Sequence, residues 1–212
     1  MDIERYIEII EQPSLWVTEL QNQWLRPRGR LANAAYTGLY VINWILTRLL
    51  FRVSVEGLEH LAISGPFVLT PNHASPLDPP MLAATIPLAV LQHTYWAGKQ
   101  STVLQNRLRR FMSWLTRVIP IREDRTSLAA AVTILEQGHN LVWFPEGVRS
   151  LDGQLHDFKP GIAILLSRCD VPVVPVLIQG AYDAFPAPGS WPGLWTRIVV
   201  RIGRPVTAHQ LG

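Results

Sequence analysis

Cysteine is nearly absent from this sequence of 212 residues. The one thiol belongs to Cys169, so no disulfide can form within the chain. Disulfides are typical of secreted proteins, and the amino terminus also lacks the short apolar core and small-residue cleavage site of a signal peptide. We therefore expect a protein that stays in a reducing compartment inside the cell.

Charged residues are also scarce, at 17% of the chain, whereas 48% of the residues are apolar and eight are tryptophans. This profile is too hydrophobic for a disordered protein and greasy for a freely soluble one, which favours a membrane surface as a partner. Lysine is rare as well: only Lys99 and Lys159 are lysines, and the other 17 basic residues are arginines. The planar guanidinium suits phosphate or carboxylate recognition, although a GC-rich genome would produce the same bias.

The amino-terminal part of the chain lacks the turn-rich strand pattern of the remainder. Residues 3–10 and 15–25 are predicted to form two short amphipathic helices, which Pro13 separates. We therefore divide the chain into residues 1–52, an amphipathic region that anchors the protein in the membrane interface, and residues 53–212, the main domain.

An apolar, aromatic run at residues 31–51 is long enough to cross a bilayer. Asn33, Asn43 and Arg48 within the run favour instead a helix that lies in the membrane interface or re-enters it. The alternatives are a true membrane span and a helix that simply packs on the domain.

From residue 53 onward, predicted strands and helices alternate. The strands are expected at residues 67–70, 94–97, 118–121, 140–144, 171–178 and 197–202. The helices are expected at residues 78–85, 103–117, 127–137 and 161–168. This order predicts a single α/β domain with a mixed, mostly buried sheet flanked by helices. Because the chain stops soon after the last strand, we expect a domain that is truncated at its carboxyl end or forms part of a longer fusion.

The segment NHASPLD, residues 72–78, lies where a predicted strand gives way to a turn and then to a helix. Loops at strand ends are where open α/β folds bind ligands. Asp78 can fold back across the turn and accept the Nδ1–H of His73, which would leave Nε2 as a general base. The alternative is that Asp78 only caps the helix that begins there.

A second polar segment, FPEGVRS at residues 144–150, also follows a hydrophobic strand directly. Gly147 permits close backbone approach, and Arg149 offers a fork of donors for a phosphate. Glu146 can accept a hydrogen bond from a substrate hydroxyl or hold the arginine in place. The alternative is an ordinary turn with a surface ion pair.

Together, NHASPLD and FPEGVRS resemble the signature motifs of the glycerophospholipid acyltransferase family. The four residues between His73 and Asp78 match the spacing that the family uses. Two further blocks support the resemblance, which covers residues 54–206. VIPIR ends in Arg122, where the family has an arginine that helps to bind the acceptor phosphate, and VPVVPV contains Pro175, where the family shapes the acyl and acceptor pocket.

The resemblance implies transfer of a fatty-acyl group from the co-substrate acyl-coenzyme A or acyl carrier protein to a hydroxyl, most often that of 1-acylglycerol 3-phosphate. His73 would take the hydroxyl proton, and Asp78 would orient and stabilise the imidazolium. The residues that the resemblance places in substrate binding are Lys99, Arg122, Glu146, Gly147, Arg149, Ser150 and Pro175. Glu123 and Asp124 place negative charge beside Arg122, which favours Arg149 as the phosphate ligand.

The same resemblance implies no metal and no further cofactor, and nothing in the chain resembles a nucleic-acid-binding module. No acyl-enzyme is needed, so we expect Ser75 to cap the following helix and Cys169 to be buried filler. Membrane lipids are the expected partners, at the cytoplasmic face of the inner or plasma membrane. The basic residues at 103–117 would either contact anionic lipid or simply be solvated.

Other functions remain compatible with the motifs. One alternative is acylation of glycerol 3-phosphate, of a lysolipid with a larger headgroup, or of a neutral alcohol or amine. Another is a non-catalytic lipid-binding module that has kept the scaffold.

Overall fold

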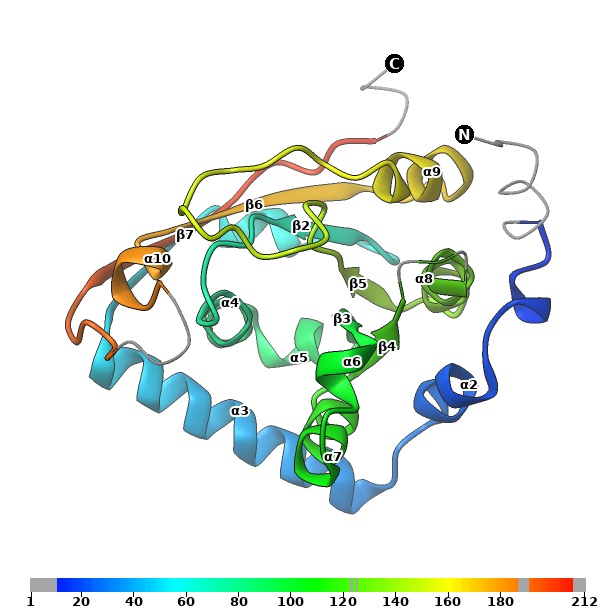
Figure 1. Ribbon diagram of the computed structural model, residues 1–212, viewed down its shortest axis with the longest axis horizontal. Coiled ribbons are helices and arrows are strands. Elements are labelled where there is room, and N and C mark those ends of the chain that lie inside the picture. The colour runs from blue at the N-terminus through cyan, green and yellow to red at the C-terminus, as the bar shows by residue number, and fades with distance from the viewer. Residues whose placement is uncertain (1–10, 123, 125, 187–190, 208–212) are drawn as a thin grey trace.

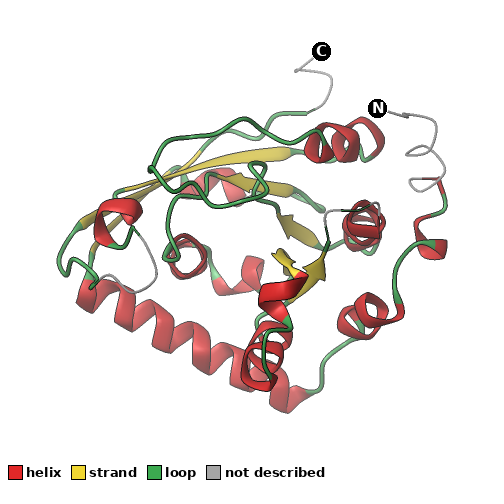
Figure 2. Ribbon diagram, viewed as in Figure 1, coloured by secondary structure: helices red, strands yellow, loops and turns green. Residues whose placement is uncertain are grey.

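The computed structural model describes residues 11–122, 124, 126–186 and 191–207. In these residues the chain forms a seven-stranded sheet with helices on both sides (Figures 1 and 2). The strands are β1 (Arg52–Glu56), β2 (Val68–Pro71), β3 (Thr94–Lys99), β4 (Val118–Ile121), β5 (Asn140–Val142), β6 (Val173–Gln179) and β7 (Arg197–Ile202). Their order is β1-β7-β6-β2-β5-β3-β4. Only the β6–β7 pair is antiparallel among these strands, which confirms the predicted mixed sheet.

The α-helices alternate with these strands along the chain. They are α2 (Glu19–Leu25), α3 (Arg30–Leu50), α4 (Asp78–Thr85), α5 (Leu88–Leu91), α6 (Gln100–Val103), α7 (Arg107–Leu115), α8 (Thr126–Glu136), α9 (Gly161–Arg168) and α10 (Ala181–Ala184). Short 3₁₀ helices cover Pro13–Leu15 and Leu58–Leu61. The predicted helices at 78–85 and 161–168 and the predicted strands at 118–121 and 197–202 are confirmed to the residue.

Alternate residues of the strands contribute their side chains to two apolar clusters, one on each face of the sheet. In β2, Leu69 belongs to the cluster that includes residues of α3 and α4. Its neighbour Val68 belongs to the cluster formed with α8 and α9. Both side chains are fully buried. The period of two along a strand therefore explains why the parallel part of the sheet is a continuous apolar run.

Three sequence-based expectations differ from the structure. The helix expected at 103–117 is shorter and covers only Arg107–Leu115, because α6 ends at Val103 and the side chain of Asn106 accepts a hydrogen bond from the backbone N–H of Arg109 at the start of α7. The helix expected at 15–25 begins only at Glu19, where Thr18 forms a capping box. Strand β1 was not expected. The helix predicted at 3–10 lies outside the described residues.

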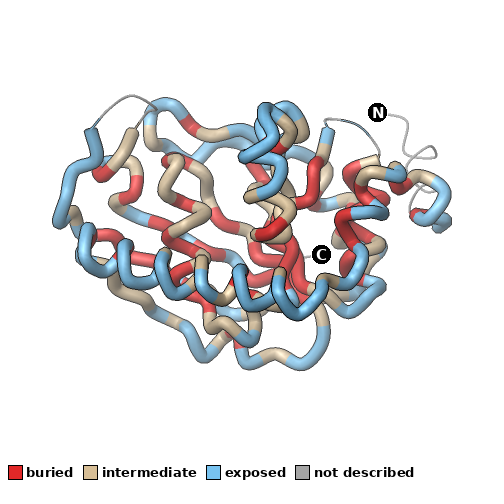
Figure 3. The backbone as a smooth tube through the Cα atoms, turned by 90° about the horizontal axis from the view of Figure 1, so that it is seen from below, coloured by how far each residue is buried: buried red, intermediate tan, exposed pale blue. Residues whose placement is uncertain are grey.

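Helix α3 has two different sides. Tyr36 is buried in the core, and the side chains of Asn43 and Arg48 donate to the backbone carbonyls of Pro80 and Ala84 at 2.8 and 3.4 Å. Elsewhere the helix exposes large apolar side chains, which are Leu31, Val41, Ile42, Trp44, Ile45, Leu46, Leu49 and Leu50. Figure 3 shows this helix crossing the underside of the molecule.

The exposed apolar side chains of α3 suit a helix that lies in the membrane interface, and the anchoring role of this region stays a prediction. No helix in the described part of the chain combines the length and apolarity that a bilayer crossing requires.

The stability loss caused by substitution of Leu69, in the central strand β2, should show that this residue lies in the core. We expect Leu69→Ala to lower the free energy of unfolding by about 2–5 kcal/mol, because it leaves a cavity between strand and helix. Leu177→Ala, on the outer face of β6 where the side chain is 41% exposed, should cost about 1 kcal/mol or less. Urea denaturation measures both values, and equal losses would contradict this assignment of the core.

Candidate active site

The loop between β2 and α4 folds around the side chain of Asp78. Oδ2 of this carboxylate accepts three hydrogen bonds: from Nδ1 of His73 at 2.9 Å and from the backbone N–H groups of Ala74 and Ser75 at 2.7 Å each. Because a carboxylate can only accept, the Nδ1 atom of His73 carries a proton. The other ring nitrogen, Nε2, then has a free lone pair and can act as a base.

Asp78 is the first residue of α4, yet its carboxylate bonds upstream to the loop instead of to the helix N–H groups. The side chain is fully buried, whereas that of His73 is 22% exposed. Oδ1 is buried without a hydrogen-bond partner. One oxygen of this carboxylate therefore makes all three hydrogen bonds that hold the loop.

The FPEGVRS segment holds the backbone of His73. The N–H of His73 donates to Oε1 of Glu146 at 2.7 Å, and the N–H of His156 donates to Oε2 of the same carboxylate at 3.1 Å. The N–H of Ser150 donates to the carbonyl of His73 at 2.8 Å. Both oxygens of the buried Glu146 are thus engaged by backbone groups, and none of the described contacts joins it to Arg149. Its geometry is that of a residue that positions the dyad.

Two neighbours of the dyad were not singled out in the sequence. Asn72 bonds to the backbone of Ile178 in β6, accepting from its N–H at 2.7 Å and donating to its carbonyl at 3.1 Å. The ring of Phe144 lies against the imidazole of His73, with centroids 4.3 Å apart. Both residues lie inside the two motifs, but a sequence does not show in which direction their side chains point.

Gly147, Arg149 and Ser150 each have a different environment. Gly147 has a φ of +72°, a backbone conformation that favours glycine, whereas a Cβ there would meet only the flexible end of the Lys159 side chain. Nε of Arg149 is buried and has no partner, which leaves a donor ready for a ligand. Ser150 is buried and donates through its hydroxyl to Asp152 at 2.7 Å. That bond is the main reason why the pKa of Asp152 lies well below its usual value.

Lys99 is the last residue of β3, and Arg122 directly follows β4. His73 follows the end of β2, and these three strands are parallel, so all three residues lie at the carboxyl edge of the sheet. Both basic side chains are exposed, and Nε of Arg122 lies 3.5 Å from a carboxylate oxygen of Asp124. The structure therefore places Lys99, Arg122 and His73 on one edge of the sheet, and the negative charge of Asp124 partly offsets the positive charge of Arg122.

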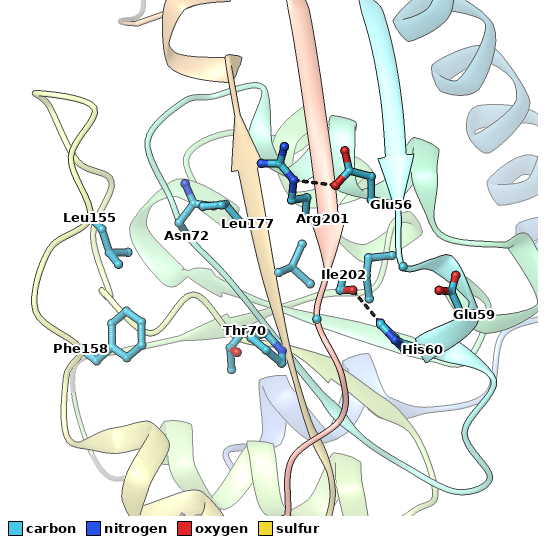
Figure 4. A pocket seen from close by; sticks show the side chains of 14 residues that line it. Glu56, Glu59, His60, Thr70, Asn72, Leu155, Phe158, Leu177, Arg201 and Ile202 are labelled. Atoms are coloured by element: carbon cyan, nitrogen blue, oxygen red, sulfur yellow. Dashed lines mark hydrogen bonds and ion pairs between the residues drawn. The ribbon is translucent and has the colours of Figure 1, made fainter.

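Pro175 lies apart from the dyad. It lines an open pocket of about 590 Å³ over the outer face of β6 and β7, together with Asn72, Leu155, Phe158 and Leu177 (Figure 4). Its neighbours Val174 and Val176 face the cluster that contains α4, so Pro175 faces away from it. His73 does not line this pocket, and Asn72 is the link between the two places.

Neither of the two remaining polar candidates has the environment of a nucleophile. The hydroxyl of the buried Ser75 donates to the carbonyl of Phe185 at 2.7 Å and accepts from the N–H of Leu77. Our expectation that Ser75 caps α4 was wrong, because Leu77 is the N-cap residue. Burial raises the pKa of the Cys169 thiol, which disfavours a thiolate.

The described residues contain no group of three His, Cys, Asp or Glu side chains that could hold a metal ion. That the reaction needs no metal or cofactor stays a prediction.

The positioning role of Glu146 can be tested without an activity assay. Glu146→Gln offers one acceptor and an amide group in place of two acceptors, so one backbone N–H loses its partner. We expect the free energy of unfolding to fall by about 1–3 kcal/mol and the amide proton of His73 to exchange faster with solvent. Glu59→Gln makes the same change at an exposed position and should alter neither quantity. Unchanged exchange at His73 in Glu146→Gln would rule the role out.

Comparisons with known proteins place this geometry in a family. A family model described as Acyltransferase matches residues 52–179. Human 1-acyl-sn-glycerol-3-phosphate acyltransferase alpha is 31% identical in an alignment of 145 positions that covers 63% of this chain and 48% of that protein. The 1-acyl-sn-glycerol-3-phosphate acyltransferase of Limnanthes douglasii is 30% identical in an alignment of 141 positions that covers 63% of this chain and 47% of that protein. The chain thus spans about half the length of these curated relatives.

A solved structure shares the fold. The crystal structure of the 1-acyl-sn-glycerophosphate (LPA) acyltransferase PlsC from Thermotoga maritima superposes with a TM-score of 0.66 at 23% identity, covering 98% of this chain and 87% of that one. The family model covers more than half of the chain and includes both the His73 loop and the FPEGVRS segment. The chain therefore belongs to the Acyltransferase family.

Proposed function

We propose that this protein transfers a fatty-acyl group from a thioester to the hydroxyl of a lysophosphatidic-acid-like acceptor, as a step of phospholipid biosynthesis. The observation that carries the proposal is the buried Asp78 carboxylate, which holds the Nδ1–H of His73 and leaves Nε2 free. The relatives that share the family model are named as acyltransferases of 1-acyl-sn-glycerol 3-phosphate, which supports this substrate class.

The proposed reaction has one chemical centre. Nε2 of His73 takes the proton of the acceptor hydroxyl while the oxygen attacks the thioester carbonyl. When the tetrahedral intermediate collapses, the carbon–sulfur bond breaks, and the imidazolium returns the proton to the leaving thiolate. The products are an ester and a free thiol, with no acyl-enzyme. Asp78 stabilises the imidazolium between the two proton transfers.

The phosphate of the acceptor would be held at the carboxyl edge of the sheet. Arg149 supports this assignment because its Nε is buried and unpartnered beside the dyad loop. Lys99 and Arg122 lie at the same edge and would add positive charge. Gly147 and Ser150 would contribute backbone conformation, and Pro175 would border the apolar part of a substrate in the pocket with Leu155 and Phe158.

Membrane association at the cytoplasmic face is part of the proposal. The acceptor and the product are membrane lipids, and the exposed apolar side of α3 would lie in the interface. The donor would be acyl-coenzyme A or acyl carrier protein, reached from the aqueous side.

Loss of the dyad should remove turnover and leave the fold intact. We expect His73→Ala and Asp78→Asn each to lower acceptor-dependent release of thiol from palmitoyl-coenzyme A by about 10²–10⁴-fold. In Asp78→Asn, the amide oxygen can still accept the three hydrogen bonds of Oδ2, so the variant removes charge and keeps geometry. Thiol release in detergent micelles, with and without 1-acylglycerol 3-phosphate, measures the effect.

The chain offers a matched control in a second His–Asp pair, His156 with Asp152 at 3.0 Å. His156→Ala should keep the wild-type rate to within a few-fold. Full activity in His73→Ala would sink the mechanism. Silence of all proteins, each still binding vesicles, would favour an acyl carrier protein donor or the non-catalytic lipid-binding module.

The acceptor class depends on Arg149. We expect Arg149→Gln to raise the Michaelis constant for 1-acylglycerol 3-phosphate by about 10–100-fold, because a charged hydrogen bond to the phosphate is lost. The constant for a neutral monoacylglycerol should not change. Steady-state kinetics with the two acceptors make the comparison. An unchanged constant for the phosphate acceptor, with good turnover of the neutral one, would favour a neutral alcohol as the substrate.

A further inference from the structure

Two partly buried arginines, Arg28 and Arg117, lie close enough to repel each other at the edge of the sheet remote from His73. Arg28 lies between α2 and α3, and Arg117 lies in the turn between α7 and β4. Nη1 of Arg28 donates to the carbonyl of Leu115 at 3.1 Å, and its guanidinium lies 5.3 Å from the ring of Trp114. The guanidinium of Arg117 lies 5.3 Å from the ring of Tyr95. Aromatic faces and one carbonyl thus hold both cations.

Neither arginine has an acidic partner among the described ion pairs. Nε and Nη2 of Arg28 and Nε of Arg117 are buried and lack any hydrogen-bond partner. Burial, and next the charge of Arg117, lower the pKa of Arg28 to about 10, so the two cations oppose each other. Burial raises the pKa of the nearby Tyr36 to about 12, so this phenol stays neutral and supplies no negative charge.

The cluster lies at the amino edge of the parallel strands. Arg117 directly precedes β4, and His139 directly precedes β5, whereas His73 follows the end of β2. His139 lies 5.2 Å from the ring of Tyr95, and its Nδ1 is also buried without a partner. Burial, and next the charge of Arg117, lower the pKa of His139. Arg28, Arg117 and His139, from three separate segments of the chain, therefore bring nitrogens without hydrogen-bond partners to the amino edge of the sheet.

This arrangement costs stability in three ways. Buried donors lack acceptors, like charges lie close together, and Arg117 adopts a φ of +61°, which is strained for a non-glycine residue. A site that served packing alone would carry apolar side chains or supply a carboxylate. An anion with several oxygens would satisfy the free nitrogens and neutralise the repulsion. We propose that Arg28 and Arg117 form a second anion site, which binds a phosphate group away from the catalytic dyad.

The surroundings suit the headgroup of an anionic lipid. The amino-terminal end of α3 lies beside α7 (Figure 1), and both helices expose apolar side chains there, with Leu31 at 88% and Leu108 at 70% exposure. Exposed arginines surround this end and are Arg26, Arg30, Arg107, Arg109 and Arg110. A soluble phosphate shares the same chemistry, so the experiment includes both sources.

The test measures binding without acyl donor, so no acyl transfer takes place in it, and every variant keeps the proposed catalytic site, which would bind phosphatidic acid as its product. The probes are phosphatidylcholine vesicles with and without phosphatidic acid in a flotation assay, and inorganic phosphate in a thermal unfolding assay. We expect Arg28→Gln to weaken binding to the phosphatidic acid vesicles by at least about tenfold. Arg117→Asn should do the same, since asparagine tolerates a positive φ.

Arg26→Gln is the matched control, because it removes the same charge from an exposed position two residues away. Its effect should be about fivefold or less and should fade as salt is raised, whereas the effect of Arg28→Gln should persist. Arg28→Gln should unfold at the wild-type temperature or above, because the variant removes a buried unpaired charge.

The two sources of phosphate give different results. Loss of vesicle binding alone identifies a lipid headgroup, and loss of stabilisation by inorganic phosphate alone identifies a soluble phosphate compound. If Arg28→Gln and Arg117→Asn behave like Arg26→Gln in both assays, the two arginines have only a structural role and the proposal is wrong.

Discussion

The candidate site depends on the hydrogen bonds that the buried carboxylate of Asp78 accepts. A single oxygen gathers the ring N–H of His73 and two backbone N–H groups of the loop. These bonds close the chain into a turn, and the same bonds select the imidazole tautomer that leaves Nε2 free. Asp78 is also the first residue of α4, so the side chain that orients the imidazole is carried by the first turn of this helix.

The second motif completes this turn from outside. Glu146 accepts a hydrogen bond from the N–H of His73, and the N–H of Ser150 donates to its carbonyl. Asn72, the residue before His73, bonds through its side chain to the backbone of β6. Three strands that are neighbours in the sheet, β2, β5 and β6, thereby lead into one site. The first motif supplies the His73–Asp78 pair and the second holds the backbone of His73, a relation that neither segment shows when it is considered alone.

The sequence predicted most of this, and the misses have physical causes. The pairing of His73 with Asp78 follows from local spacing, so it could be derived. The contacts of Glu146 depend on side-chain direction across the sheet, which spacing does not determine. Strand β1 has a weak sequence signal because it is a short, half-exposed edge strand with polar residues, and its partner β7 is remote in sequence. The helix break at Asn106 has a local signal, because asparagine is a favoured N-cap residue.

The polar residues of α3 connect the site to the surface that we propose for the membrane. Asn43 and Arg48 argued against a bilayer span, and the structure uses both to bind carbonyls of α4. One of these carbonyls belongs to Pro80, two residues from Asp78. The helix that exposes the apolar side chains is thus bonded to the helix that begins with Asp78. In the membrane-bound state that we propose, the depth of α3 in the interface would therefore set the height of His73 above the lipid.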